Sequence, residues 1–156
     1  MIHATWHSIL SQIFFVGQVI LALGLGALIG WQRHAIGAAA GTRTYGLVSA
    51  GAAIFTILSI HAFAGSDTSR VAGQVVVGIG FLGAGLIIQR ESRVHGLTTA
   101  AGLWASAAIG MAVGVGFYLL AIVGALIMLA VLMIDEAKII KARSQSENTP
   151  PDIIGK

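Results

Sequence analysis

Long stretches without a formal charge constrain the fold of this chain more than any other feature. No Asp, Glu, Lys or Arg precedes Arg33, and the later charged residues leave uncharged stretches at 44–66, 71–89 and 94–134. A helix needs about 20 apolar residues to cross a bilayer. The first three stretches each fit one span, and the last fits two if Gly114-Val115-Gly116 forms a turn. The predicted fold is an all-α, polytopic transmembrane bundle of about five helices, near residues 13–31, 45–64, 71–89, 97–113 and 117–134.

Composition supports a membrane protein. Only 10% of the residues are charged and 56% are hydrophobic, whereas a soluble domain normally carries about 25% charged residues. Cysteine is absent, which excludes disulfides, thiol catalysis and thiolate metal sites. A cleaved signal peptide is the alternative for the first segment, but residues 1–12 contain no Lys or Arg and the apolar run continues to Trp31. We therefore expect this segment to be a membrane span.

The loop charges predict an orientation. Lys and Arg gather on the cytoplasmic side of membrane proteins. The second loop carries Asp67 and Arg70, which cancel, and the fourth carries no charge. The basic residues of the first loop, the third loop and the segment after the last span are Arg33, Arg43, Arg90, Arg93, Lys138, Lys141 and Arg143. This pattern predicts an outside N-terminus and an inside C-terminus, with a transmembrane domain at 1–134 and a short cytoplasmic tail at 135–156.

The glycines of the third span allow more than one interpretation. Residues 78–83 match G-x-G-x-x-G, but they lie inside an uncharged run, and Glu91, the next acid, follows Gly78 by only 13 positions. This context argues against a dinucleotide site. On a helix, Gly78 and Gly85 share one face, and Gly80 and Gly83 lie nearly opposite, which predicts a central helix approached closely by two neighbours. The alternative is a helix unwound at these glycines to bind an ion.

Other small or polar residues are candidates for helix packing. Ala22, Gly26 and Gly30 form a small-xxx-small stripe in the first span, and alanines 101, 105, 108 and 112 form another in the fourth. Gln74 could hydrogen-bond across helices, and Trp104 is expected to anchor the packing. The full set expected to hold the helices together is Gly26, Gly30, Gln74, Gly78, Gly80, Gly83, Gly85 and Trp104.

The sequence offers no support for catalysis or for a metal centre. A magnesium site needs clustered oxygen ligands, yet no predicted span contains Asp or Glu. We expect Asp67 to cap the third helix and His61 to lie at the membrane interface. No nucleophile with an oriented base is present. We therefore expect no enzyme activity, no cofactor and no metal site.

The arginines of the predicted cytoplasmic side are the strongest site candidates. We expect Thr98 to cap the fourth helix, which would bring the positive end of that helix to the guanidinium groups. Such a site could bind an acidic group of a lipid, a nucleotide or a partner protein. The alternative is that the arginines only set topology and contact lipid phosphates. The candidate partner- or anion-binding residues are Arg33, Arg43, Arg90, Arg93 and Thr98.

Three blocks of sequence carry a family resemblance. They are residues 25–30 (LGALIG) with Arg33 and 40–44 (AGTRT), residues 70–85 (RVAGQVVVGIGFLGAG), and residues 94–110 (VHGLTTAAGLWASAAIG). In this order and spacing, over about residues 13–134, the chain resembles the membrane domain of the MgtC/SapB family. The resemblance implies a multi-pass protein of the bacterial inner membrane without established enzymatic activity. It implies links to magnesium homeostasis, to growth in magnesium-poor or host-cell environments, and to restraint of the F-type ATP synthase.

The resemblance also implies partners and marks departures. The expected partners are the lipid bilayer, another membrane protein such as the F-type ATP synthase, and a second copy in a homodimer, but no nucleic acid. Gln32 stands where the family usually has Glu, and His95 stands where it usually has another basic residue. Longer members also carry a soluble C-terminal domain, which we do not expect in this chain. The functional hypothesis is a non-enzymatic regulator that binds a membrane partner, and the alternative is an ion transporter or channel built around the third span.

The predicted orientation can be tested with reporter fusions. A reporter active only in the periplasm, fused before Met1, and one active only in the cytoplasm, fused after Lys156, should both be active. Matched fusions with the two reporters exchanged should be silent. Activity of the exchanged pair alone would reverse the orientation.

Overall fold

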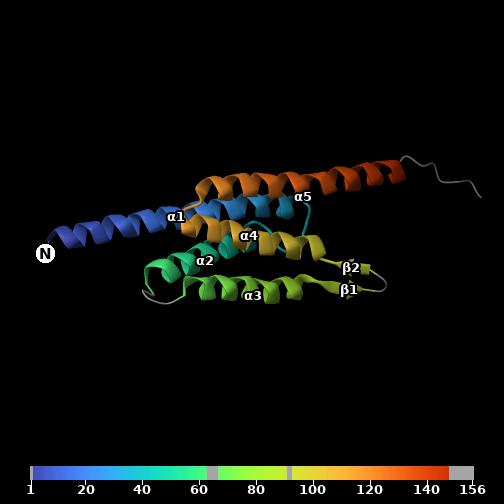
Figure 1. Cartoon of the computed structure of the whole chain (residues 1–156). Coiled ribbons are helices and arrows are strands. Elements are labelled where there is room, and N and C mark those ends of the chain that lie inside the picture. Colours follow the sequence, from blue (N-terminus) through green and yellow to red (C-terminus); the bar gives the residue numbers. More distant parts are fainter. Residues whose placement is uncertain (1, 63–66, 91–92, 148–156) are drawn as a thin grey trace, which may run out of the picture.

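The computed structural model describes residues 2–62, 67–90 and 93–147, and most of them are helical. The helices run alternately up and down along a shared direction (Figure 1). Four are long and apolar enough to cross a membrane, and the apolar part of the fifth, Tyr118–Ile134, is shorter. The helices are α1 (Ile2–Ala35), α2 (Thr42–His61), α3 (Thr68–Leu86), α4 (Leu97–Val115) and α5 (Tyr118–Glu147). The predicted five-helix membrane bundle is confirmed, and its orientation stays a prediction.

A short β-hairpin between α3 and α4 was not predicted. The third span was expected to continue to residue 89, but α3 ends at Leu86. The chain then forms the antiparallel strands β1 (Ile88–Arg90) and β2 (Arg93–His95). An apolar run with β-branched residues at its end suits a strand as well as a helix, so the run alone could not locate this boundary. Gly96 then enters α4 at a φ of 86°, where an added Cβ would collide with the Leu86 carbonyl.

Two predicted loop features are confirmed. The Asp67 carboxylate accepts a hydrogen bond from the Ser69 backbone N–H at 2.9 Å and caps α3. Gly116 has a φ of 92° and ends α4, and its N–H donates to the carbonyls of Ala112 and Val113. The glycine turn therefore divides the long uncharged run where the sequence indicated.

The core lies between α1, α2 and α4, with α5 covering α1 and α4 (Figure 1). Ile29 of α1, Tyr45 of α2, and Leu103 and Val113 of α4 are almost completely buried. Helix α3 instead lies at the edge against α2 and α4, and Gly83 is its only buried residue among those described. The prediction that the third span is central is therefore wrong.

The α3 glycines do not pack as predicted. A Cβ added to Gly78, Gly80 or Gly85 would meet nothing within 4 Å, whereas one at Gly83 would contact Ala100 at 3.7 Å. Glycine on a helix face permits close approach but does not bring a neighbour there, because the partner must also offer a small surface. Helix α3 is also continuous through these glycines. The structure therefore shows neither two helices packed closely against these glycines nor an unwound segment in α3.

The close helix contacts lie elsewhere. Gly26 and Gly30 face α2 as predicted, since an added Cβ would lie 2.5 Å from the Tyr45 carbonyl oxygen or 2.7 Å from that of Gly41. Gly110 and Gly114 of α4 face α2 in the same way, with an added Cβ at Gly114 lying 2.8 Å from a backbone oxygen of α2. The predicted alanine stripe of α4 faces outward instead, with Ala101 and Ala108 exposed. The closest contacts of α4 with α2 are therefore made at glycines outside the predicted alanine stripe.

Two other packing candidates are not buried. The Trp104 side chain is 49% exposed and, together with Val76 and Ile79 of α3, lines a shallow hollow. It is therefore not the buried anchor that was predicted. Gln74 is also exposed and faces the space between α2 and α3, so the structure gives it no role in joining helices.

The close contact between α1 and α2 predicts a position-specific effect of alanine. Gly26→Ala should lower the free energy of unfolding by about 1–3 kcal/mol, because the added methyl group meets backbone that cannot move aside. Gly24→Ala is the matched control, since nothing lies within 4 Å of its added Cβ on the same helix. Thermal or denaturant unfolding in detergent micelles measures the difference. Equal stability of the two variants would contradict the close approach at Gly26.

Candidate functional site

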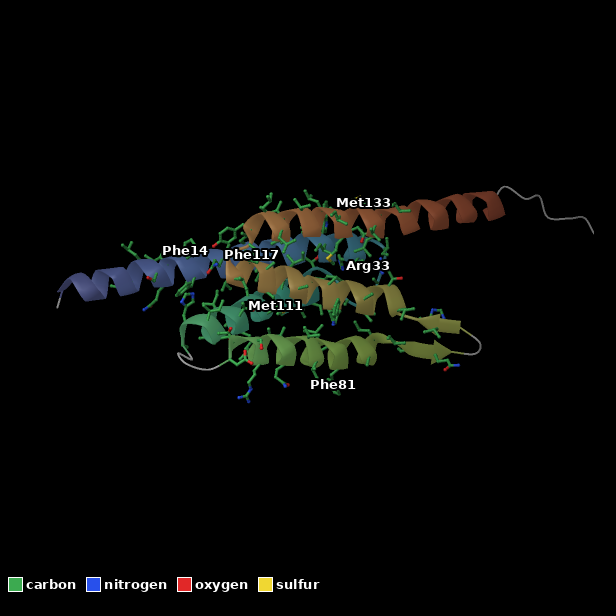
Figure 2. All side chains as sticks on the ribbon, in the orientation of Figure 1. Phe14, Arg33, Phe81, Met111, Phe117 and Met133 are labelled. Atoms are coloured by element: carbon green, nitrogen blue, oxygen red, sulfur yellow. The ribbon has the colours of Figure 1, made fainter. Side chains whose placement is uncertain are left out.

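Arg33 is buried inside the bundle near the C-terminal end of α1 (Figure 2). Its side chain is only 7% exposed, and its Nη2 donates a hydrogen bond to Thr99 Oγ1 in the first turn of α4 at 3.1 Å. An arginine that only contacted lipid phosphates would extend to the membrane surface. Its burial therefore favours the site hypothesis over the topology-only alternative.

Helical spacing explains why Arg33 faces inward. Residues three and four apart share a face of a helix, and Ala22, Gly26, Ile29 and Gly30 form the packed face of α1. Arg33 is the next position of that stripe. The glycines let α2 come close, and the long arginine side chain reaches α4 beside it.

Tyr45 connects α2 to the same position. Its side chain is fully buried, and its hydroxyl donates to the Thr99 backbone carbonyl at 3.0 Å. The hydroxyl also lies close enough to the Arg33 guanidinium to interact with it. Gly102 makes room for the ring, because an added Cβ there would lie 2.6 Å from the tyrosine hydroxyl. Arg33, Tyr45 and Thr99 form what we call the arginine cluster, which joins α1, α2 and α4.

The arginine cluster and the residues beside it contain buried polar atoms without a hydrogen-bond partner. Arg33 Nε, Gln32 Oε1 and Ser49 Oγ are buried and have no hydrogen-bond partner. Among the side chains that the structure describes, the single carboxylate belongs to Asp67, which lies beyond the opposite end of α2. A buried charge is costly unless it is paired, and the N-terminus of α4 adds partial positive charge beside it. The electrostatics of this position therefore favour an added acidic group.

Gln32 and Gln18 join α1 to other helices through their amide groups. Gln32 Nε2 donates to the Leu132 carbonyl of α5 at 3.2 Å. Gln18 Nε2 donates to the Val113 carbonyl and to the Tyr118 hydroxyl, each at 2.9 Å. Glutamate has no donor when it is ionised, so the Gln32 contact requires the amide at this position. These two glutamines therefore connect helices in the way that was predicted for Gln74.

The structure brings together only part of the predicted site. Thr98 does not cap α4, because the cap is Gly96 without a side-chain hydrogen bond, and Thr98 is exposed. The neighbouring Thr99, which was not predicted, is the residue that meets Arg33. The glycine ends the hairpin at positive φ, and this moves the helix start ahead of both threonines.

The remaining predicted arginines lie outside the cluster or cannot be placed in it. Arg43 is exposed in the first turn of α2. The backbones of Arg90 and Arg93 pair directly across the hairpin, and their side chains lie outside the described part of the chain. No group of three or more His, Asp or Glu residues that could hold a metal ion occurs among the described residues.

The chain is similar to known proteins over most of its length. A family model described as the MgtC family matches residues 19–138. "Putative magnesium transporter YhiD" of Escherichia coli (strain K12) is 45% identical over 127 residues, covering 76% of this chain and 59% of that protein. "Protein MgtC" of Brucella abortus (strain 2308) is 47% identical over 107 residues, covering 69% of this chain and 45% of that protein. The chain spans about half the length of the curated relatives it matches, and no solved structure matches it.

Neighbouring threonines provide a matched test of the cluster. Thr99→Val removes the oxygen that accepts from buried Arg33 and should destabilise the protein by about 1–3 kcal/mol. Thr98→Val makes the same chemical change at an exposed position and should stay within about 0.5 kcal/mol of the parent. Unfolding in detergent measures both, and equal effects would contradict the assignment of Thr99 to the cluster.

Proposed function

The chain belongs to the MgtC family, and from this premise and the buried arginine cluster we propose a regulatory, non-enzymatic role in the membrane. The protein affects magnesium homeostasis or membrane energetics by binding an acidic group of a membrane partner. The name of the Escherichia coli relative supports the link to magnesium. The family resemblance supports the location in the bacterial inner membrane.

The single observation that carries the proposal is that buried Arg33 has a hydrogen-bond donor without a partner. Its guanidinium is permanently charged, buried and bonded through Nη2, while its Nε has no partner. A carboxylate of a partner would gain a charge-assisted hydrogen bond in an environment of low dielectric constant. The positive end of α4 adds to this attraction. These features support recognition of an acidic group better than catalysis or lipid anchoring.

The family resemblance names a candidate for the partner. It links such proteins to restraint of the F-type ATP synthase, and we take that enzyme as the first membrane partner to test. Binding through a carboxylate explains how a chain without a readable catalytic group could act on a larger complex. A homodimer is the second partner to examine.

The transporter alternative has less support. It depended on unwinding of the third span at its glycines, whereas α3 is a continuous helix from Thr68 to Leu86. A magnesium pathway also calls for clustered oxygen ligands, and the five apolar segments contain no Asp or Glu. The regulatory role therefore remains the favoured proposal.

The proposal predicts that the Arg33 guanidinium is needed for function. In a deletion strain, Arg33→Gln should fail to restore growth in low magnesium or the parental ATP level, at equal membrane abundance. Arg33→Lys should also fail, because an ammonium group lacks the planar donors of the guanidinium. The matched control is Arg43→Gln, which removes an exposed arginine from the first turn of α2 and should complement fully.

A second control separates binding from stability. Thr99→Val weakens the internal contact of Arg33 but keeps its guanidinium. This variant should still complement when its abundance matches the parent. Full complementation by Arg33→Gln at parental abundance would show that Arg33 is only structural and would contradict the proposed function.

A further inference from the structure

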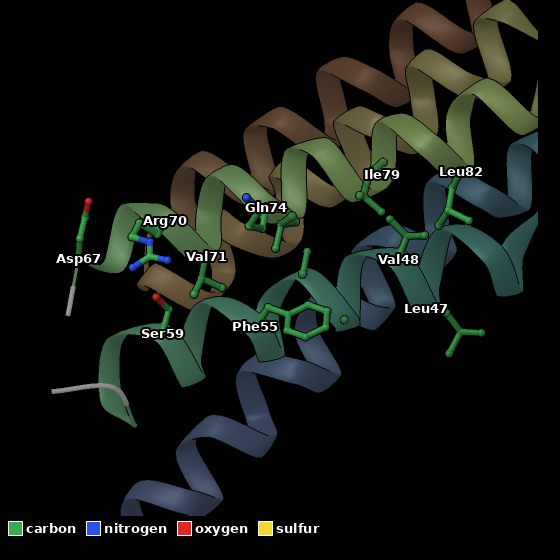
Figure 3. Close-up of a pocket in the computed structure, with 14 residues that line it drawn as sticks. Leu47, Val48, Phe55, Ser59, Asp67, Arg70, Val71, Gln74, Ile79 and Leu82 are labelled. Atoms are coloured by element: carbon green, nitrogen blue, oxygen red, sulfur yellow. The ribbon is translucent and has the colours of Figure 1, made fainter.

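An apolar groove lies between α2 and α3, on the side of α2 that faces away from α5 (Figure 3). It has a volume of about 830 Å³ and is open to one side. Phe55 of α2 and Val71, Ile79 and Leu82 of α3 contribute to its walls. Its polar lining residues are Gln74 along the groove and Ser59, Asp67 and Arg70 near the loop that joins the two helices.

The groove is a gap in helix packing that large side chains do not fill. Gly51 of α2 and Gly78 of α3 both line it, and an added Cβ at either would meet nothing within 4 Å. The two helices touch near the loop, where Ser59 Oγ donates to the Thr68 carbonyl at 3.1 Å. The two helices therefore meet at the loop end of the groove, beside Arg70.

The length of the groove matches one leaflet of a bilayer. Arg70 and Leu82 are 12 residues apart on α3, or about 18 Å. Half of the bilayer's hydrocarbon thickness is about 15 Å. The acyl chains of one leaflet can therefore lie along the groove from end to end.

The loop end of the groove offers a positive charge. Figure 3 shows the Arg70 guanidinium directed toward Ser59 and the Asp67 carboxylate directed away from the groove. That carboxylate accepts from the Ser69 N–H at 2.9 Å and from the Ser69 hydroxyl at 2.6 Å, and these bonds hold its pKa below the usual value. Asp67 is thus engaged with its own helix end, and the Arg70 charge remains available to a phosphate.

We propose that this groove binds one phospholipid from the leaflet on the side of the α2–α3 loop. Its acyl chains lie along Phe55, Val71 and Ile79, and its phosphate binds Arg70. The proposed phosphate position at Arg70 lies at the opposite end of α2 from the arginine cluster. It is therefore a second site that nothing in the proposed function requires.

Native mass spectrometry of the full chain, released from nanodiscs of defined lipid, tests the site. With phosphatidylglycerol, we expect one retained lipid per chain. Diacylglycerol with the same acyl chains should be retained at least fivefold less, because it lacks the phosphate. Arg70→Gln should reduce retention of phosphatidylglycerol to the diacylglycerol level and leave retention of diacylglycerol unchanged.

Two α3 glycines provide a matched pair of variants. Gly78→Leu fills the groove and should lower phosphatidylglycerol retention at least fivefold, whereas Gly80→Leu should retain it like the parent. Both positions have open space for a side chain, but only Gly78 lines the groove. Gly51→Leu fills the groove from α2 and replaces Gly78→Leu if that variant does not fold.

Several outcomes would overturn the proposal. Equal retention by Gly78→Leu and Gly80→Leu, or by phosphatidylglycerol and diacylglycerol, would show that the retained lipid is not in this groove or is not held by its phosphate. A lipid-free dimer that Gly78→Leu dissociates would assign the groove to a second copy of the chain. Because Arg33 is unchanged in every variant, these outcomes do not bear on the proposed function.

Discussion

The rest of the structure depends on the close approach of the α1, α2 and α4 backbones at glycine. In a bilayer the hydrophobic effect does not drive helices together, so association depends on van der Waals contact and hydrogen bonds. Gly26 and Gly30 bring α1 onto α2, and Gly110 and Gly114 bring α4 onto α2. These approaches are too close for a Cβ. They set the distances over which every polar contact between the three helices forms.

The arginine cluster follows from this packing. Arg33 reaches the first turn of α4, and Tyr45 reaches the same threonine, because α1 and α4 both lie against α2. Farther along α4, Ser106 donates to the Tyr45 carbonyl at 3.2 Å. Burial makes these bonds strong, and it also makes the unused Nε of Arg33 costly. The same constraint that stabilises the bundle therefore creates a position where an acidic group would be attracted.

The sequence predicted the features that a bilayer imposes directly. Spans follow from the lengths of uncharged runs, and the turn at Gly116 and the cap at Asp67 follow from local backbone chemistry. The position of α3 could not be predicted, because its glycines show which faces could pack but not which face meets a neighbour. The burial of Arg33 was not predicted, because charged residues were assigned to the loops. Arg33 nevertheless lies on the same face of α1 as Gly26 and Gly30, and this spacing could have indicated its burial. Thr98 was preferred to Thr99 because the positive φ of Gly96 was unknown, and that angle sets where α4 begins.

The two ends of the molecule differ in how tightly their helices are held. At the arginine cluster, α1 and α2 approach closely at Gly30 and Gly41, and the buried side chains of Arg33 and Tyr45 reach α4. Along α3 only Gly83 is buried, so α3 packs less extensively on its neighbours than α1, α2 and α4 pack on one another. The position of α3 at its far end is nevertheless fixed, since Gly96 contacts the Leu86 carbonyl where the hairpin enters α4. The proposed lipid groove and the proposed site for an acidic group thus lie in differently packed parts of the molecule, the first beside α3 and the second between α1, α2 and α4.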